Sequence, residues 1–142
     1  MTEPLIERHP SHIDLKALAR LYEAVGFGLA KSYDPRLLQN ALTNSDYIIT
    51  AIDLPTKKLT GFLRALSDEV SVTWISEIMV DPEHQKTGIG RKMLAILIED
   101  LGHTAIYGEA LRGSEEFFTS CQITVKEKLI AVSRAPHILD QT

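Results

Sequence analysis

A short loop past the middle of the chain has residue types and spacing that suit phosphate binding. It runs Gln85-Lys86-Thr87-Gly88-Ile89-Gly90. Glycine has no Cβ, so Gly88 and Gly90 let the backbone approach a ligand closely. An apolar pattern typical of a helix follows, and the first N–H groups of a helix have no acceptor within it. These N–H groups lie at the positive end of the helix dipole and would bind a phosphate group.

A strand, a turn and a helix are predicted to position this loop. Ile75, Ile78 and Val80 supply the β-branched residues of a strand, which Asp81-Pro82 ends. The following helix precedes Gly102, and its apolar residues recur at helical spacing, at Ile89, Met93, Ile96, Leu97 and Leu101.

Two common phosphate-binding motifs do not fit the loop. A P-loop requires Gly-Lys-Ser/Thr, whereas the chain has Gly90-Arg91-Lys92. A dinucleotide fingerprint requires a third glycine where Met93 stands, within an opening strand-helix-strand unit. A tight strand-to-helix turn without a ligand is the structural alternative at this point.

The composition predicts one soluble domain, residues 1–142, without nucleic-acid or membrane partners. The net charge is −4, from 15 basic and 19 acidic residues, and no basic run occurs. No apolar run is long enough to span a membrane, and the N-terminus lacks the apolar segment of a signal peptide. The single cysteine, Cys121, excludes an intramolecular disulfide and suits the cytoplasm, which is the expected location.

Two helices are expected in the first third of the chain. Apolar residues at helical spacing run from Ile13 to Val25 and again from Leu37 to Leu42. The second helix is opened by Asp34-Pro35, a typical N-cap and first-turn pair. A further short helix is predicted at Glu115–Cys121.

The strands are predicted to form an antiparallel meander followed by one parallel strand. Gly61 marks a bulge or a close approach within the meander. A strand at Thr104–Tyr107 follows a helical crossover, so it should be parallel to Ile75–Val80. The other predicted strands are Leu5–Arg8, Tyr47–Ile52, Leu59–Leu66, Val70–Val80, Thr124–Val125 and Leu129–Ser133.

The spacing Gln85-x-x-Gly88-x-Gly90 after Ile78-Met79-Val80-Asp81-Pro82 resembles the acetyl-CoA-binding motif of the GCN5-related N-acetyltransferases. The order of elements over Leu15–Val132 is similar to the whole fold of this family. The resemblance implies an α/β (α+β) fold whose mixed, mostly antiparallel sheet is splayed between Ile75–Val80 and Thr104–Tyr107 and flanked by about four helices.

The resemblance also implies that acetyl-CoA is the cosubstrate and that an amine attacks it directly. The pyrophosphate would bind backbone N–H groups of the loop, and the pantetheine arm would pair with the strand before it. A Met79 or Val80 N–H would polarise the thioester carbonyl. The implied cofactor-binding residues are Ile78, Met79, Val80, Gln85, Lys86, Thr87, Gly88, Ile89, Gly90 and Arg91.

Glu77 is the candidate catalytic base. An alkylamine has a pKa near about 10 and must lose a proton before it attacks. Many family members carry an acid at this point of the strand, and pairing with a cation is the structural alternative. Phe27, Tyr33 and Asp68 are candidate substrate-binding residues, with hydrophobic anchoring and a solvated turn as their structural alternatives.

The general acid of the family is absent from its usual place. Family members often carry a Tyr there, within a Phe-Tyr-x-x-x-Gly-Phe pattern, whereas this chain has Phe118. Cys121, Ser120, Tyr107 or a water remain as alternative proton donors to the leaving thiolate. The histidines show no metal-ligand spacing, so no metal is expected.

The expected function is N-acetylation of a primary amine on a small molecule, either a small amine or an amino-acid-like molecule. Tyr22–Gly26 and Gly61–Asp68 resemble segments of family members that acetylate small amines. A protein acetyltransferase acting on lysine or an N-terminal amine is one alternative. An acyl-CoA-binding sensor without turnover is the other, because Phe118 cannot donate a proton. Exposed edge strands near the C-terminus would allow a homodimer.

Overall fold

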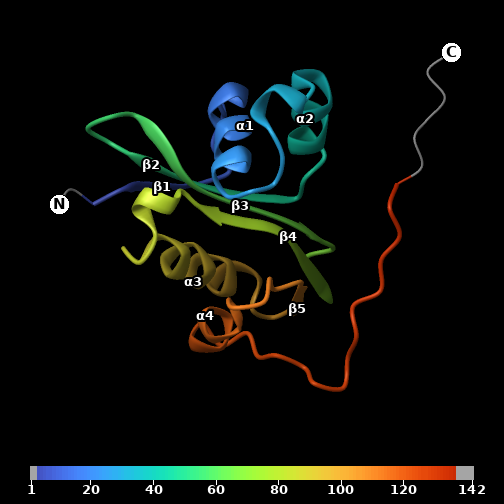
Figure 1. The fold of residues 1–142 in the computed structure, drawn as a ribbon. Helices are drawn as coiled ribbons and strands as arrows, with labels where there is room; N and C mark the ends of the chain where they lie inside the picture. The colour runs from blue at the N-terminus through green and yellow to red at the C-terminus, as the bar shows by residue number, and fades with distance from the viewer. Residues whose placement is uncertain (1–2, 137–142) are drawn as a thin grey trace, which may run out of the picture. The chain divides into compact units, whose positions relative to one another are not determined.

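A five-stranded sheet forms the centre of the computed structural model, which describes residues 3–136 (Figure 1). The strands lie in sequence order, and each pair is antiparallel except β4 and β5, which are parallel. Their bounds are β1 (Leu5–Arg8), β2 (Tyr47–Asp53), β3 (Lys58–Ser67), β4 (Val72–Val80) and β5 (Ala105–Gly108). The mixed, mostly antiparallel sheet predicted from the sequence is confirmed.

The chain divides into two compact units, residues 1–108 and 109–142. The first contains the whole sheet with α1 (Leu15–Ala24), α2 (Pro35–Thr43) and α3 (Ile89–Leu101). Two 3₁₀ turns, Ala30–Ser32 and Pro82–His84, also belong to it. The second unit contains α4 (Glu115–Ser120). The prediction of one acetyltransferase domain stays a prediction.

Helices cover both faces of the sheet within the first unit, with α1 and α2 on one face and α3 on the other (Figure 1). Local sequence explains where the first two begin. Asp14 accepts hydrogen bonds from the N–H groups of Lys16 and Ala17, and Asp34 accepts one from Arg36 with Pro35 in the first turn. Both carboxylates satisfy N–H groups that have no acceptor within the helix.

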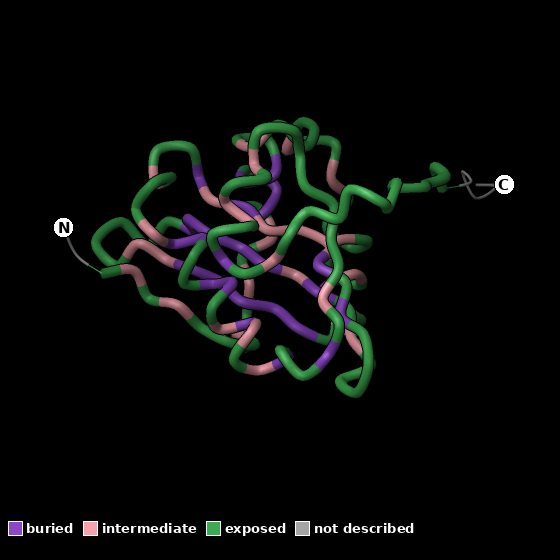
Figure 2. Tube along the Cα trace, turned by 90° about the horizontal axis from the view of Figure 1, so that it is seen from below, coloured by how far each residue is buried: buried purple, intermediate pink, exposed green. Residues whose placement is uncertain are grey.

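The core lies along the central strands, where the chain is most deeply buried (Figure 2). On the α1 face, Phe62 and Met79 pack with Leu18, and on the α3 face Met93 and Leu97 are fully buried. A continuous apolar layer on each face therefore fixes the sheet between the helices.

Gly61 confirms the predicted close approach between β3 and α3. A Cβ atom at this position would lie 2.9 Å from Ile89 Cγ2 and 3.1 Å from Met93 Cε. The pairing between β2 and β3 shifts beside it, because Ala51 pairs with Gly61 and Ile52 with Leu59. Only glycine lets the start of α3 lie this close to β3.

β4 contains a bulge and then leaves β5. Arg64 pairs with Glu77 but Ala65 pairs with Ile75, so Ser76 is an extra residue in β4. Pairing between β4 and β5 ends at Ile75 with Gly108. Residues 76–80 therefore run on without a β5 partner in the described chain, which confirms the predicted splay.

The predicted closing strands Thr124–Val125 and Leu129–Ser133 are wrong. Turns and irregular backbone occupy residues 121–136, and α4 ends one residue before the predicted Cys121. The apolar side chains that suggested these strands are exposed, Ile130 by 87%. A short β-branched run becomes a strand only where it finds a pairing partner, and the described residues supply none here.

Candidate active site

A pocket of about 620 Å³ opens between the helices α1 and α2 and the strands β3 and β4. Three of the predicted site residues, Glu77, Phe27 and Tyr33, are brought together in its wall. Half of the other lining residues are apolar residues of α2. The full lining is Tyr22, Phe27, Ser32, Tyr33, Asp34, Leu37, Leu38, Ala41, Leu42, Arg64 and Glu77.

Glu77 lies at the sheet side of the pocket in a dense hydrogen-bond network. Arg64 Nε donates to Glu77 Oε2 over 2.7 Å, and Arg64 Nη2 donates to Oε1 over 2.8 Å. The Tyr22 hydroxyl donates to the same Oε1 over 2.8 Å. The cation pairing that was the structural alternative for Glu77 is therefore present, and its carboxylate nevertheless borders the pocket.

Electrostatic interactions keep Tyr22 and Arg64 protonated, so that both remain hydrogen-bond donors to Glu77. Burial, and then the Glu77 carboxylate, raise the pKa of Tyr22, so its phenol stays protonated at neutral pH. The hydrogen bond to Glu77 raises the pKa of Arg64, which stays cationic. The Tyr22 ring also stacks on Tyr33, with centroids 4.8 Å apart. Neither partner can take a proton from a substrate.

The bulge in β4 turns Glu77 toward the pocket. If Ile75, Ser76 and Glu77 alternated regularly, Glu77 would share a face with Ile75, whose register partner Ala65 places it on the α3 side. With the bulge, Glu77 shares a face with Met79, as alternation predicts. The Met79 side chain is 2% exposed and belongs to the α1-side core, so only its backbone can contact a ligand.

The predicted phosphate loop leads directly into α3. Gly88 has a φ of +92°, a conformation that other residues rarely adopt, and α3 begins at Ile89. Because glycine has no side chain, it cannot cap the first N–H groups of α3 as Asp14 and Asp34 cap α1 and α2. A Cβ at Gly88 would meet no atom within 4 Å, so the backbone here is open.

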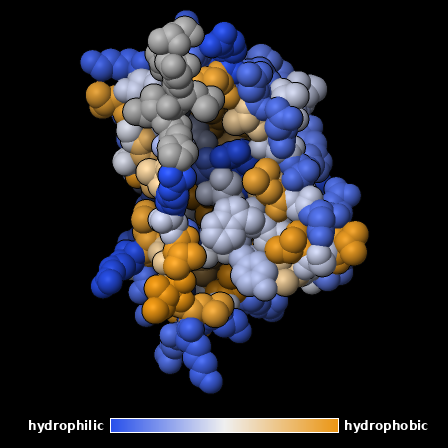
Figure 3. Space-filling view, turned by 90° about the vertical axis from the view of Figure 1, so that its right-hand side faces the viewer, coloured by the Kyte–Doolittle hydropathy of each residue, from blue (hydrophilic) through white to orange (hydrophobic). Residues whose placement is uncertain are grey.

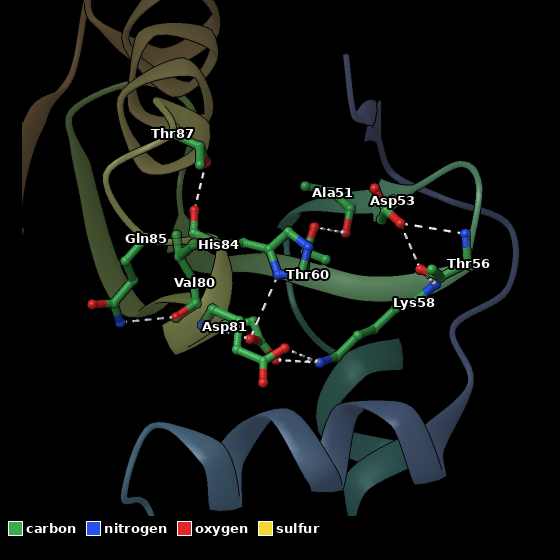
Figure 4. Close-up of polar contacts among 11 residues, drawn as sticks. Ala51, Asp53, Thr56, Lys58, Thr60, Val80, Asp81, His84, Gln85 and Thr87 are labelled. Carbon is green, nitrogen blue, oxygen red and sulfur yellow. Dashed lines mark hydrogen bonds and ion pairs between the residues drawn. The ribbon is translucent and has the colours of Figure 1, made fainter. Parts of the chain in front are cut away.

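Two side chains of the loop donate hydrogen bonds to backbone carbonyls of the residues that precede it (Figure 4). Gln85 Nε2 donates to the Val80 carbonyl over 3.0 Å, and the Thr87 hydroxyl donates to the His84 carbonyl. Gln85 and Thr87 therefore set the path of the backbone. Lys86, at a φ of +64°, and Arg91 are exposed charged residues on either side of Gly88.

An ion pair fixes the exit of β4 (Figure 4). Lys58 Nζ lies 3.0 Å from Asp81 Oδ2, and the Asp81 N–H donates to the Thr60 carbonyl over 2.8 Å. The Asp81 side chain is 7% exposed. Burial opposes its ionisation, but the hydrogen bonds from Lys58 and from the Glu83 N–H hold the pKa of Asp81 below its usual value.

Asp68 lies in the β3–β4 turn and does not line the pocket. Its Oδ1 accepts hydrogen bonds from the N–H groups of Val70, Ser71 and Val72. The Ser71 hydroxyl, and then these N–H groups, lower the pKa of Asp68. Asp68 therefore stabilises the turn between β3 and β4, which agrees with the structural alternative of a solvated turn.

The candidate proton donors differ in environment. Phe118 lies in α4 against Phe117, with ring centroids 5.3 Å apart, and Cys121 is buried within the same unit. Tyr107 lies in β5 opposite Trp74 and is 48% exposed. The identity of the general acid stays open.

Two residues of the network were not assigned a function from the sequence. Tyr22 and Arg64 fall within segments that resemble small-amine acetyltransferases, and that was the available signal. Their meeting with Glu77 depends on strand register and on the packing of α1 against the sheet.

Neither a metal-ligand cluster nor a helix able to span a membrane occurs in residues 3–136. No group of three or more His, Cys, Asp or Glu side chains in this part of the chain could hold a metal ion. None of its helices combines the length and the apolar character needed to cross a bilayer.

Solved structures with the same fold are acetyltransferases. A GNAT family acetyltransferase from Streptococcus pneumoniae superposes with a TM-score of 0.70 at 21% identity, covering 93% of this chain and 99% of that one. An aminoglycoside acetyltransferase from an uncultured soil metagenomic sample gives 0.71 at 24%, covering 94% and 97%. Glucosamine-6-phosphate N-acetyltransferase from Arabidopsis thaliana gives 0.65 at 13%, covering 92% and 98%. At these identities the likeness shows the fold.

Sequence comparison supplies the family. The chain is 31% identical over 107 residues to GCN5-related N-acetyltransferase 1, chloroplastic, of Arabidopsis thaliana, covering 75% of this chain. It spans only about half of that relative (53%), and 23% of a second one, GCN5-related N-acetyltransferase 2, chloroplastic. The family model "Acetyltransferase (GNAT) family" matches residues 15–120. With its split sheet and open loop before α3, the chain therefore belongs to the GNAT family of acetyltransferases.

Proposed function

We propose that this protein transfers an acetyl group from acetyl-CoA to the primary amine of a small molecule. The observation that carries the proposal is the sequence of features along one segment of the first unit. Glu77 borders the pocket, residues 76–80 lack a β5 partner, and the uncapped start of α3 follows at Gly88. An acceptor pocket, a backbone edge and an anion site thus follow one another within one segment.

The anion site fits the pyrophosphate of acetyl-CoA. Backbone N–H groups from Gln85 to Gly90 would bind it, with charge from Lys86 and Arg91. The unpaired edge of β4 at Ile78–Val80 would hold the pantetheine arm by strand addition. When bound, acetyl-CoA supplies the thioester that the amine attacks, and a Met79 or Val80 N–H would polarise its carbonyl.

The pocket fits the acceptor. Glu77 would accept the proton of the ammonium, directly or through water, because a protonated amine cannot attack. Apolar side chains from the loop before α2 and from α2 itself, including Phe27, Tyr33 and Leu38, would contact the apolar part of the amine. A pocket of about 620 Å³ is of the size that small-molecule sites have in proteins.

The proposal is tested by measuring thiol release from acetyl-CoA with a panel of small amines, aminosugars and lysine peptides. The wild-type protein should acetylate a small amine, and Glu77→Gln should lower kcat by about a hundredfold. The matched control is Glu7→Gln, which changes an exposed carboxylate of β1 outside the pocket. An unchanged rate for Glu77→Gln at every pH would remove Glu77 from the mechanism.

The same assay separates the two alternative functions. Turnover of peptides alone would show a protein acetyltransferase. Tight coenzyme A binding without thiol release across the panel would show a sensor. The observation that favours a sensor is Phe118, whose side chain carries no exchangeable proton. A cytoplasmic location also stays a prediction, and the two Arabidopsis relatives are named as chloroplastic.

We also infer that the chain forms a homodimer through the open end of its sheet. Strand register places Leu66, Trp74 and Tyr107 side by side on one face, and each is at least 40% exposed. On this side of the molecule, Figure 3 shows apolar side chains, in orange, around pale side chains of intermediate hydropathy. A second copy would cover this face and pair with the outer edge of β5.

A further inference from the structure

The Glu77 carboxylate is almost fully occupied before any substrate binds. A carboxylate offers about four lone-pair positions to hydrogen-bond donors. On Glu77, Oε1 accepts from Tyr22 and from Arg64 Nη2, and Oε2 accepts from Arg64 Nε. The remaining position is on Oε2, and Glu77 lines the pocket.

Arg64 is held as firmly as the carboxylate that it binds. Its Nη2 also donates to the Ser76 hydroxyl over 2.9 Å, and Nη1 donates to the Ser45 hydroxyl over 3.4 Å. Ser76 is the bulge residue of β4, so the same irregularity orients Glu77 and fixes its partner. The Arg64 side chain is only 20% exposed. It cannot turn toward a substrate without breaking this network.

The charges of the pocket follow from this arrangement. Its lining contains three ionisable charged side chains, Asp34, Arg64 and Glu77. Arg64, the cation among them, is already paired bidentately with Glu77. Asp34 is an exposed acid at the start of α2. A substrate carboxylate entering the pocket would meet Asp34, and the described lining residues offer it no available cation.

We propose that Arg64 is a positioning residue: it fixes Glu77 so that one lone pair of Oε2 receives the acceptor ammonium or its water. Because Arg64 is already paired with Glu77, it cannot bind a substrate carboxylate. The acceptor is therefore an amine without a carboxylate beside it, rather than an α-amino acid. This inference rests on the proposed function and adds the substrate class and the device that sets it.

A double-mutant cycle tests the positioning. Arg64→Met should lower kcat by about tenfold or more, and should change KM for the amine less. In a Glu77→Gln background the same substitution should cause less than about a twofold further loss, because Arg64 acts through Glu77. Arg64→Lys should restore part of kcat, since it keeps the charge but loses the bidentate fork. Additive losses in the cycle would overturn the positioning.

Controls separate this inference from folding defects and from the proposed function. Arg8→Met removes a comparable arginine–carboxylate pair, Arg8 Nε to Asp100 Oδ2 at 2.7 Å, and should leave the kinetics unchanged. Each variant should bind coenzyme A as wild type does by calorimetry. If the wild-type protein acetylates no amine, the proposed function is refuted. If the wild-type protein is active but the losses in the cycle are additive, only the positioning role of Arg64 is refuted.

The acceptor class is tested with matched pairs of an amino acid and its decarboxylated amine, such as leucine and 3-methylbutylamine. In the wild type, kcat/KM for the amine should exceed that for the amino acid by about tenfold or more. Glu77→Gln removes the charge that binds Arg64, so Arg64 becomes available to a substrate carboxylate. The ratio of kcat/KM for the amine to that for the amino acid should therefore fall in this variant, even though both rates drop. Equal use of the two acceptors by the wild type would contradict the inference.

Discussion

Asp81 lies along the chain between Glu77, which lines the pocket, and the loop that is predicted to bind phosphate. It is buried at the end of β4, where it pairs with Lys58 and accepts from the Glu83 N–H over 2.9 Å. The sequence marks Asp81-Pro82 as a strand end. The sequence does not predict that Lys58 pairs with Asp81, because this contact depends on β3 and β4 being neighbours in the sheet. Side-chain pairs across strands depend on register, which local pattern does not determine.

We predict that Asp81→Asn makes the protein less stable in a pH-dependent way. The hydrogen bonds from Lys58 and from the Glu83 N–H outweigh burial and hold the folded-state pKa of Asp81 below its usual value, so the ionised carboxylate stabilises the fold at neutral pH, and this stabilisation is lost as the pH falls through the folded-state pKa. The loss in unfolding free energy should be about 1–3 kcal/mol at pH 7 and should shrink as the pH falls below about 4. Urea titrations of both proteins from pH 7 to pH 3 measure it, and a pH-independent difference would be the contrary result.

At the scale of elements, the position of α3 on the sheet decides where the proposed anion site would lie. Gly61 lets Ile89 approach β3, and Ile89 is the first residue of α3. The helix, its start and the close approach at Gly61 were all predictable, because they are encoded in local periodicity and in a glycine within a strand. The closing strands were not, because their formation depends on distant partners.

Gly61→Ala should destabilise the protein by about 1–3 kcal/mol, because the new Cβ would lie 2.9 Å from Ile89 Cγ2 and 3.0 Å from Ala51 Cβ. Coenzyme A affinity should fall as well, since the start of α3 must shift. Gly108→Ala is the matched control, because its Cβ would meet nothing nearer than 3.5 Å. Chemical denaturation and calorimetry measure the two effects. Equal stability of the two variants would show that α3 does not depend on Gly61.

At the scale of the molecule, the open end of the sheet carries the exposed side chains of Leu66, Trp74 and Tyr107, which the proposed dimer would bury. Its apolar side chains belong to strands whose other ends are buried. Composition and periodicity therefore did not predict that these side chains would be exposed. The split between β4 and β5 was predictable only through the family resemblance. Its extent, from Ser76 to Val80, follows from the short length of β5.

Trp74→Ser should convert the protein from dimer to monomer. It removes the central apolar side chain of the exposed row, which a second copy would bury. Light scattering after gel filtration measures the mass, and Leu54→Ser, a similarly exposed residue at the β2–β3 turn, should leave it unchanged. A monomeric wild type would refute the dimer. A monomeric wild type with a raised amine KM in Trp74→Ser would place this face in the acceptor site.

The most direct test of the account is a calorimetric titration with coenzyme A. The wild type should bind one equivalent. Gly88→Val, which puts a side chain where φ is +92°, should weaken binding by about tenfold or more. Gly26→Val carries the same backbone strain at a φ of +91° in the loop after α1 and should bind as wild type does. No association with the wild type, or equal affinity for Gly88→Val, would contradict the claim that backbone amides at the start of α3 hold the cosubstrate.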